Sequence, residues 1–171
     1  MPAMDTTRFE GLLLRYHGPL RRLSGAYAGA VEAGDLFQEV ALALWTALPN
    51  LRGESSERTW VYRVAHNTAI SFVARQRKLR EREPVQPPSF EPASPDNPER
   101  ELLVDEKRRR LQRAVHELPL PNRQVMLLHL EGLSAAEIET ITGCTAGAVA
   151  TRLTRSRQWL AERVNHEEEK R

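Results

Sequence analysis

Six of the chain's eleven prolines lie within residues 83–100, and this cluster limits the possible folds more than any other feature. Proline has no backbone N–H and restricts the residue before it, so neither a helix nor a sheet propagates through such a stretch. Amphipathic patterns flank it on both sides, which favours a semi-extended linker of at most about 55 Å. The alternative is a disordered insertion within one domain. We expect two domains, at residues 1–82 and 101–171, joined by this Pro-rich linker.

The first expected domain contains two stretches with the apolar spacing of amphipathic helices. In residues 35–48, Leu36, Val40 and Leu44 follow this spacing. Four side chains share a different face of the same helix: Asp35, Gln38, Glu39 and Leu42. Residues 57–80 carry a second apolar stripe and end in a run of Arg and Lys, and turn-forming residues separate the two stretches. No strong hairpin signal is present, so the expected fold class is all-α.

The second expected domain begins with a charged amphipathic helix at residues 101–118. Pro121 suits the first turn of the next helix, and Gly132 is expected to end it. Two closely spaced helix starts follow, because Ser134 and Glu137 form the pattern of a capping box and Thr145 can cap another helix.

Gly143 lies between these two helix starts and can take the positive φ that a tight reversal requires. Val149, Leu153 and Leu160 of the second helix are expected to face inward. Five residues are expected to face outward: Ala146, Ala150, Thr151, Thr154 and Arg155. A short helix, a tight turn and a second helix with small exposed residues are typical of a DNA-binding helix-turn-helix. On this stretch alone, a helical hairpin with a solvated arginine face is the alternative.

Composition narrows the function classes. A net charge of +2 and a pI near 9.0 are compatible with nucleic-acid binding but do not require it. The single cysteine excludes a disulfide framework, and the five histidines have no metal-ligand spacing. We expect no metal, no cofactor and no enzymatic activity, and we expect His66 to be a polar surface or groove residue. No stretch resembles a signal peptide or a membrane span, so a cytoplasmic location is expected.

Two blocks of the sequence carry family motifs. Residues 35–70 are similar to D-L-x-Q-E-x-x-L-x-L-W, F-R-G-x-S and R-T-W-L-Y-R-I-A-x-N. Residues 118–160 are similar to L-P-x-x-x-R-x-V-x-x-L, G-L-S-x-x-E-I-A and G-x-V-x-x-R-L-x-R-A-R. Together the blocks resemble bacterial RNA polymerase sigma factors of the extracytoplasmic-function (ECF) type, in the sigma-70 family. The resemblance implies a region 2-like bundle, a region 4-like helix-turn-helix, and a role in promoter recognition and transcription initiation.

The resemblance also assigns roles to residues. The face that docks on the largest subunit of core RNA polymerase is matched by Asp35, Gln38, Glu39 and Leu42. Contacts to the minus-ten promoter element are matched by Leu51, Arg52, Gly53, Glu54, Ser55, Ser56, Trp60, Tyr62, Asn67, Arg75, Arg77, Lys78 and Arg80. Contacts to the minus-thirty-five element are matched by Thr145, Ala150, Thr151, Arg152, Thr154 and Arg155.

Physical chemistry agrees with these roles and leaves some alternatives open. Residues 51–56 offer backbone N–H groups, hydroxyls and room for a flipped base, aromatic rings can stack on unpaired bases, and the Arg and Lys run can hold phosphates. The docking face has an ordinary solvated surface as its alternative. Trp60 and Tyr62 are equally candidates for the core, and Arg152 for a structural role.

The sequence departs from the family pattern at three positions. Glu57 stands where an apolar or aromatic residue is common, and Glu139 replaces the usual alanine of E-I-A. Ala150 occupies a position where Lys or Arg is common, so one expected DNA contact to the upstream element is missing.

The partners implied are core RNA polymerase and promoter DNA. An anti-sigma factor acting in trans is a further candidate partner, because no regulatory domain is evident. The alternative function is a helix-turn-helix repressor or activator that is not a polymerase subunit. Such a protein needs a dimerisation surface or an effector pocket, and the sequence indicates no dedicated one.

Overall fold

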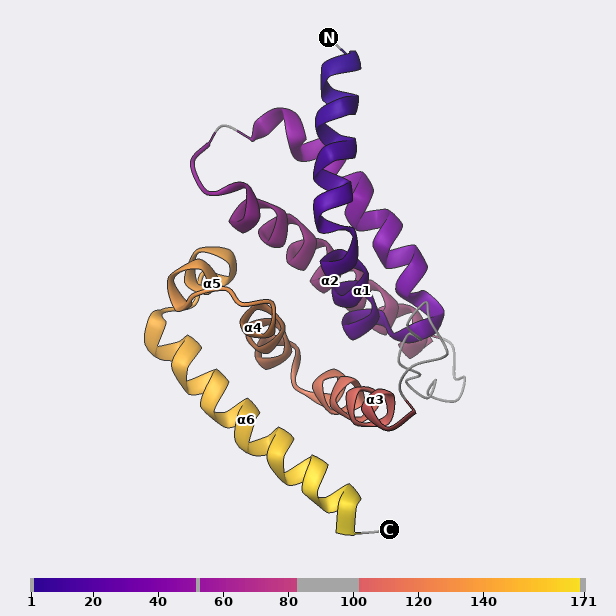
Figure 1. Cartoon of the computed structure of the whole chain (residues 1–171), viewed down its shortest axis with the longest axis vertical. Coiled ribbons are helices and arrows are strands. Elements are labelled where there is room, and N and C mark those ends of the chain that lie inside the picture. Colours follow the sequence, from indigo (N-terminus) through magenta and orange to yellow (C-terminus); the bar gives the residue numbers. More distant parts are fainter. Residues whose placement is uncertain (1, 52, 83–101, 170–171) are drawn as a thin grey trace. The chain divides into compact units, whose positions relative to one another are not determined.

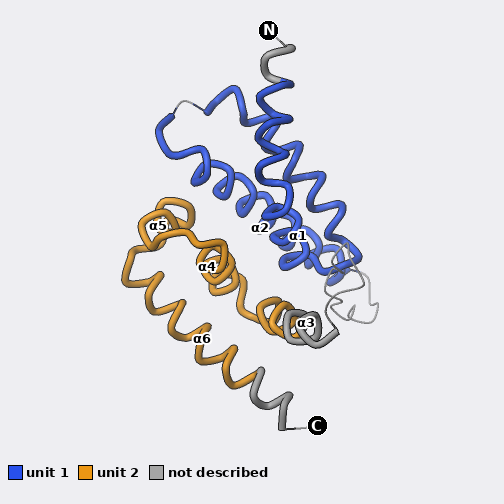
Figure 2. Tube along the Cα trace, in the orientation of Figure 1, with its two compact units in different colours: residues 1–89 blue, residues 90–171 orange. Residues whose placement is uncertain are grey.

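The computed structural model describes the backbone of residues 2–51, 53–82 and 102–169. All regular secondary structure in these ranges is helical, which confirms the all-α prediction. The chain divides into two compact units, unit 1 (residues 1–89) and unit 2 (residues 90–171), shown in Figure 2. The predicted Pro-rich linker, residues 83–100, lies wholly outside the described residues.

Unit 1 begins with α1 (Pro2–Ala47), which is broken in its middle. Gly29 has φ 74° and ψ −178°, a backbone conformation that is essentially restricted to glycine. Figure 1 shows that the chain reverses direction within α1. The two parts are named helix 1a (residues 2–28) and helix 1b (residues 30–47).

Ring contacts join helix 1a to helix 1b along their length. Phe9 and Trp45 meet edge to face with centroids 5.1 Å apart, and His17 meets Phe37 at 5.3 Å. These contacts hold the two halves of α1 as an antiparallel pair. Edge-to-face aromatic pairs stabilise such packing beyond the area that they bury.

The rest of unit 1 is a short 3-10 helix, η1 (Leu48–Asn50), and α2 (Glu57–Arg82). α2 packs along α1, so three long helical segments share one apolar core. Leu20 of helix 1a, Leu36 of helix 1b and Val61 of α2 are all completely buried there. The two helices predicted in this half of the chain are confirmed, and helix 1a is an additional element.

The core of unit 1 contains a buried histidine. We expected His66 at a polar surface or groove, and this is wrong because its side chain is fully buried. Its Nδ1 lies 2.8 Å from the Tyr27 hydroxyl, and Nε2 has no hydrogen-bond partner among the described residues. Burial lowers the pKa of His66 to about 3, so the imidazole is neutral at physiological pH.

Unit 2 contains α3 (Leu102–Glu117), α4 (Leu120–Leu130), α5 (Ala135–Thr142) and α6 (Ala146–Glu169) within its described residues. α6 packs against each of the other three helices. Part of its core is an apolar cluster that joins α3, α4 and α6: Ala114, Val115, Leu118, Met126 and Leu160. Further buried apolar residues extend the core to α5 and the start of α6, among them Leu128, Ile138 and Val149. As predicted, proline lies in the first turn of α4, and Gly132 follows its end with φ 76°.

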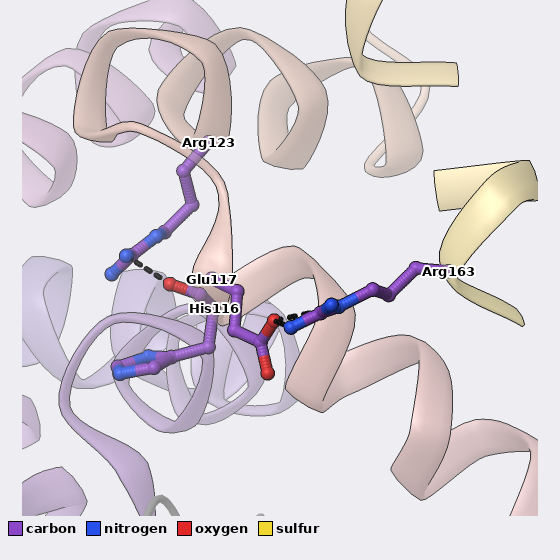
Figure 3. Close-up of polar contacts among 4 residues, drawn as sticks. All are labelled: His116, Glu117, Arg123 and Arg163. Atoms are coloured by element: carbon purple, nitrogen blue, oxygen red, sulfur yellow. Dashed lines mark hydrogen bonds and ion pairs between the residues drawn. The ribbon is translucent and has the colours of Figure 1, made fainter. Parts of the chain in front are cut away.

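The junction between α3 and α4 is held by Arg123, as Figure 3 shows. Its Nη2 donates to the backbone carbonyl oxygens of His116 and Leu118, the second at 3.1 Å. Carbonyls at the end of a helix lack an intrahelical partner, so the guanidinium satisfies them. Glu117, in the same turn, accepts hydrogen bonds from Nε and Nη2 of Arg163 at 3.0 and 2.5 Å, which ties this junction to α6.

Candidate nucleic-acid interface

Helix 1b presents most of the predicted docking side chains on one exposed face. Asp35 and Gln38 are exposed, and the Leu42 side chain is 64% exposed. Trp45 lies one turn further on. It is partly exposed, and its ring contacts the ring of Phe9 edge to face. A carboxylate, an amide and apolar groups on one face fit a protein partner that combines basic and apolar groups.

Glu39, the fourth predicted docking residue, is engaged within unit 1. Arg75 of α2 donates from Nη2 to both carboxylate oxygens, each at 2.7 Å. The structure therefore brings together two side chains that were predicted for different partners. Helical spacing within one segment gave no sign of this pair, because the residues are 36 positions apart.

Two more members of the predicted basic run are also in ion pairs. Arg80 Nη2 lies 3.0 Å from Oε1 of Glu32 on helix 1b, and Arg77 Nε lies 2.9 Å from Glu81 Oε1. Lys78 is exposed. Surface ion pairs contribute only about 0–1 kcal/mol each, so phosphate groups can replace these carboxylates.

The predicted base-binding loop, residues 51–56, connects η1 to α2. Arg52 lies outside the described residues. Gly53 has φ 78°, and a Cβ there would meet no atom within 4 Å, so backbone conformation rather than space requires glycine. The other side chains of the loop differ in exposure: half-buried Leu51 and Ser55, and exposed Glu54 and Ser56.

Ser56 ends this loop as the cap of α2. Its Oγ accepts the Thr59 N–H at 3.1 Å and donates to Thr59 Oγ1 at 2.9 Å. The next residue, Glu57, accepts hydrogen bonds from Arg15 Nη2 of helix 1a at 2.9 and 3.0 Å. The downstream end of the loop is therefore fixed by both a helix cap and an ion pair.

The three remaining predicted minus-ten residues on α2 differ in exposure. Asn67 is exposed, as a reading residue must be. Trp60 and Tyr62 are only 6% and 3% exposed. Their burial favours the core alternative for both aromatic residues, because stacking on a base would require their rings to leave the core.

The predicted turn between α5 and α6 is confirmed. Ser134 Oγ accepts the Glu137 N–H at 3.3 Å, and Glu137 Oε2 accepts the Ser134 N–H at 2.8 Å, which completes the capping box. Gly143 ends α5 with φ 70°. Thr145 Oγ1 accepts the Ala148 N–H at 3.3 Å and caps α6.

One side of the first turns of α6 is exposed and made mostly of small side chains. All the residues predicted to face outward there are exposed: Ala146, Ala150, Thr151, Thr154 and Arg155. The hydroxyls of Thr151 and Thr154 donate to the carbonyl oxygens of Gly147 and Ala150 at 2.9 and 3.0 Å. Small side chains at the start of a helix allow close approach to a DNA groove.

Two arginines of α6 are engaged with other parts of unit 2. Arg152 is half-buried, and its Nη1 lies 2.7 Å from Cys144 Sγ, which favours the structural alternative for this residue. Arg157 Nη2 lies 2.8 Å from His129 Nε2 of α4. Arg155, between them in sequence, is exposed.

Metal and membrane features were also assessed over the described ranges. Among those residues, no three His, Cys, Asp or Glu side chains gather closely enough to hold a metal ion. None of the helices there combines the length and the apolar character that crossing a bilayer requires.

Two family models match the chain, one in each unit. The model of sigma-70 region 2 matches residues 12–79, and that of sigma-70, region 4 matches residues 108–160. The chain is 30% identical to the ECF RNA polymerase sigma-E factor of Escherichia coli strain K12 over 168 residues, which cover 94% of this chain and 88% of that protein. The protein of the same name from Haemophilus influenzae is 29% identical, with coverage of 94% and 89%.

Two solved structures share the fold. The sigma factor RpoE in complex with the anti-sigma factor NepR from Bartonella quintana matches with a TM-score of 0.75 at 20% identity, covering 92% of this chain and 97% of that one. CnrH in complex with the cytosolic domain of CnrY matches with a TM-score of 0.63 at 19% identity, covering 94% and 90%. At these identities the likeness establishes the fold alone.

Proposed function

The chain belongs to the ECF type of the sigma-70 family, whose members bind core RNA polymerase and direct it to promoters, and we propose how its parts divide that work. Unit 1 docks on the polymerase and binds the minus-ten element, and unit 2 binds the minus-thirty-five element. The domains are residues 1–82 and 101–171, with residues 83–100 as the linker. The observation that carries the proposal is the exposed start of α6, where small side chains and Arg155 follow the cap of a helix-turn-helix.

Polymerase docking is proposed for the exposed face of helix 1b. Asp35, Gln38 and Leu42 are accessible together, and a basic partner surface with an apolar centre complements them. Glu39 also takes part in docking: it releases Arg75 and forms an ion pair with a basic side chain of the polymerase instead. Because the Glu39–Arg75 pair is exposed, this exchange has a small free-energy cost.

Minus-ten binding is proposed for the loop and for the exposed surface of α2. The loop offers backbone N–H groups around Gly53, and Asn67 offers an amide that can pair with a base edge. The basic run of α2 positions the DNA through phosphates and carries no sequence information. Trp60 and Tyr62 support this surface from within the core.

Minus-thirty-five binding is proposed for the start of α6. Thr151, Thr154 and Arg155 face the major groove, with Ala146 and Ala150 allowing close approach. Thr145 orients the helix as its cap, and its exposed position also allows a phosphate contact. Arg152 acts through Cys144 to hold the turn.

Regulation and location follow the family. Both solved structures are complexes: one holds the anti-sigma factor NepR, and the other holds the cytosolic domain of CnrY. We extend this to the present chain and propose that an anti-sigma factor controls it in trans. The chain acts in the cytoplasm, where transcription takes place, as a binding subunit and not as an enzyme.

The alternative function, a repressor or activator outside the polymerase, is not favoured. Such a protein has no use for a region 2 unit, yet the region 2 model matches residues 12–79. A separate DNA-binding regulator would bind duplex operator unaided, whereas a sigma factor binds core polymerase.

The experiment is a core-polymerase binding assay followed by transcription in vitro. Replacing Asp35, Gln38 and Leu42 together by alanine should weaken core binding at least tenfold and leave the helical content unchanged. Glu10→Ala is the control, because Glu10 is exposed and lies on helix 1a, away from the docking face on helix 1b. This variant should bind core polymerase as the parent does. Unchanged core affinity in the triple variant would contradict the proposed docking face.

A further inference from the structure

The start of α2 contains an ion pair that the family pattern does not predict. Arg15 of helix 1a donates from Nη2 to both oxygens of Glu57, at 2.9 and 3.0 Å. The two residues are 42 positions apart, so the contact joins two separate helices. Glu57 is a departure from the family motif, which commonly has an apolar or aromatic residue there. In this chain an ion pair therefore stands in the place of an apolar contact.

Aromatic and cationic side chains surround this ion pair. The pKa of the Tyr16 hydroxyl is raised, first by burial and then by the Glu57 carboxylate beside it. The Tyr16 ring meets the ring of Tyr62 edge to face, with centroids 6.4 Å apart. The guanidinium carbon of Arg58 lies over the Tyr62 ring, 6.0 Å from its centroid. The start of α2 is thus held against helix 1a by Glu57 in its first turn and by Tyr62 in its second.

The first turn of α2 directly follows the downstream end of the base-binding loop, residues 51–56. Ser56 is the cap of α2, and Glu57 follows it directly. At the upstream end, the Leu51 N–H donates to the Leu48 carbonyl oxygen at 3.1 Å. The loop therefore runs between two anchored ends. At its downstream end, Glu57 links the loop to helix 1a through its ion pair with Arg15 and through a side-chain hydrogen bond with Tyr16.

We infer that Glu57 is a positioning residue for base recognition, because its ion pair with Arg15 holds the loop in the shape that receives an unpaired minus-ten base. The inference rests on the proposed function of this loop. The side chains of Arg15 and Glu57 are 59% and 38% exposed, so the pair adds little to folding stability. Its loss alters the loop and leaves unit 1 folded.

The test uses two substitutions that break the ion pair but change the charge in opposite directions, Glu57→Gln and Arg15→Gln. Holoenzyme is bound to labelled promoter fragments whose minus-ten non-template strand is unpaired, with the captured base varied through all four. Both variants should reduce the affinity ratio between the best and the worst base by about two- to fivefold. Overall affinity should rise slightly for Glu57→Gln and fall for Arg15→Gln, because only the first removes a negative charge near DNA.

Two further variants separate positioning from charge and from stability. Glu81→Gln removes the same charge from the Arg77–Glu81 pair, which lies within α2, and should leave the base ratio unchanged. The double variant Arg15→Glu with Glu57→Arg restores the ion pair with its charges exchanged. It should recover the base ratio, whereas Arg15→Glu alone and Glu57→Arg alone should not. Core-polymerase affinity should be the same in all variants.

Specific results would overturn the inference. An unchanged base ratio in both single variants would do so, as would an equal loss in Glu81→Gln or a charge exchange that recovers only the melting temperature. If the parent holoenzyme does not distinguish the four bases at all, the proposed function of the loop fails first, and the inference fails with it.

Discussion

Unit 1 and unit 2 are both small and helical, but different contacts hold them together. Among the described residues of unit 1, three ion pairs join helical segments that are far apart in the sequence: Arg15–Glu57, Glu39–Arg75 and Glu32–Arg80. Unit 2 has one described ion pair of this kind, Glu117–Arg163. Caps and tight turns set its helix ends, and apolar side chains pack the helices together. Several side chains of unit 1 therefore have both an internal partner and a proposed external one. In unit 2 the proposed reading side chains of α6 are mostly separate from those of the core.

The buried cores of the two units also differ in polarity. Unit 1 buries His66, a titratable group, against the Tyr27 hydroxyl. The core cluster of unit 2 is apolar. Substitutions and solution conditions should therefore affect the two units unequally, and four predictions test this difference, from the largest expected effect to the smallest.

The largest effect is expected from Leu118→Ala in unit 2. Leu118 is 2% exposed and belongs to the apolar cluster, so its truncation should lower the free energy of unfolding of unit 2 by about 2–5 kcal/mol. Hydrogen exchange on the full chain should show loss of protection in α3, α4 and α6 with unit 1 unchanged. Core-polymerase binding should persist while minus-thirty-five recognition is lost. Equal loss of protection in both units would contradict their independence.

The second prediction concerns pH and unit 1. The pKa of His66 is about 3 in the folded chain and about 6.5 in the unfolded chain, so the folded state binds fewer protons between these values. The stability of unit 1 is therefore complete above pH 6.5 and falls as the pH decreases towards 3. Between pH 7 and pH 4 the loss should be about 3 kcal/mol.

His66→Gln is the matched control for this pH effect, because glutamine is polar and does not titrate. Both proteins carry Trp159→Phe, which removes the tryptophan of unit 2, so denaturant unfolding followed by the fluorescence of Trp45 and Trp60 reports on unit 1. The parent should lose about 3 kcal/mol more than His66→Gln over this pH range. Parallel pH profiles for the two proteins would show that the buried imidazole does not control the acid stability of unit 1.

The third prediction compares two arginines of α6. Arg155 is exposed on the proposed reading side, whereas Arg157 contacts His129 of α4. Arg155→Ala should weaken holoenzyme binding to promoters with a minus-thirty-five element by about 1–3 kcal/mol if it pairs with a base. If it meets only phosphate, the loss should be uniform across sequences, and the salt slope should fall by about one.

Arg157→Ala should have a smaller effect than Arg155→Ala on the same promoters. Ala150→Arg should strengthen binding to many upstream elements, because it adds the charge that the family commonly has there. Affinities are measured with and without the upstream element at two salt concentrations. Parental affinity of Arg155→Ala for both promoters would show that α6 is not the reading helix.

The smallest effect is expected at the pair that joins two proposed surfaces of unit 1. Arg75→Gln frees Glu39 from its internal partner and should raise core-polymerase affinity by up to about fivefold. It should also lower DNA affinity for all promoters alike, because phosphate contacts position DNA without specifying sequence.

Arg77→Gln is the matched control for this pair. Arg77 pairs with Glu81 within α2 and not with a docking residue, so only DNA affinity should fall. If Arg75→Gln and Arg77→Gln change core affinity equally, the Glu39–Arg75 pair does not compete with docking.

Features with local determinants could be predicted from the sequence. The capping box of Ser134 and Glu137, the positive φ of Gly143 and the cap at Thr145 each depend on residues a few positions apart, and all are confirmed. The exposed face of helix 1b follows in the same way from helical spacing, as the exposure of Asp35 shows.

Features that depend on distant residues could not be predicted. The burial of His66 depends on Tyr27, 39 positions away, because an isolated helical pattern does not show which polar residue has a buried partner. The Glu39–Arg75 pair is missed for the same reason. Trp60 and Tyr62 fitted both the core and a DNA surface, since aromatic residues serve either, and only packing decides between them.

The break in α1 has a consequence for chirality. Without it, the 46 residues of α1 would form a rod of about 70 Å and helix 1b could not pack back on helix 1a. The conformation of Gly29 is the mirror image of ordinary extended backbone, so it is natural for a D residue and strained for any L residue. D-Alanine introduced at this position by chemical ligation should keep that backbone geometry, whereas L-alanine should oppose it. The reversal that builds unit 1 therefore depends on the one amino acid that has no handedness.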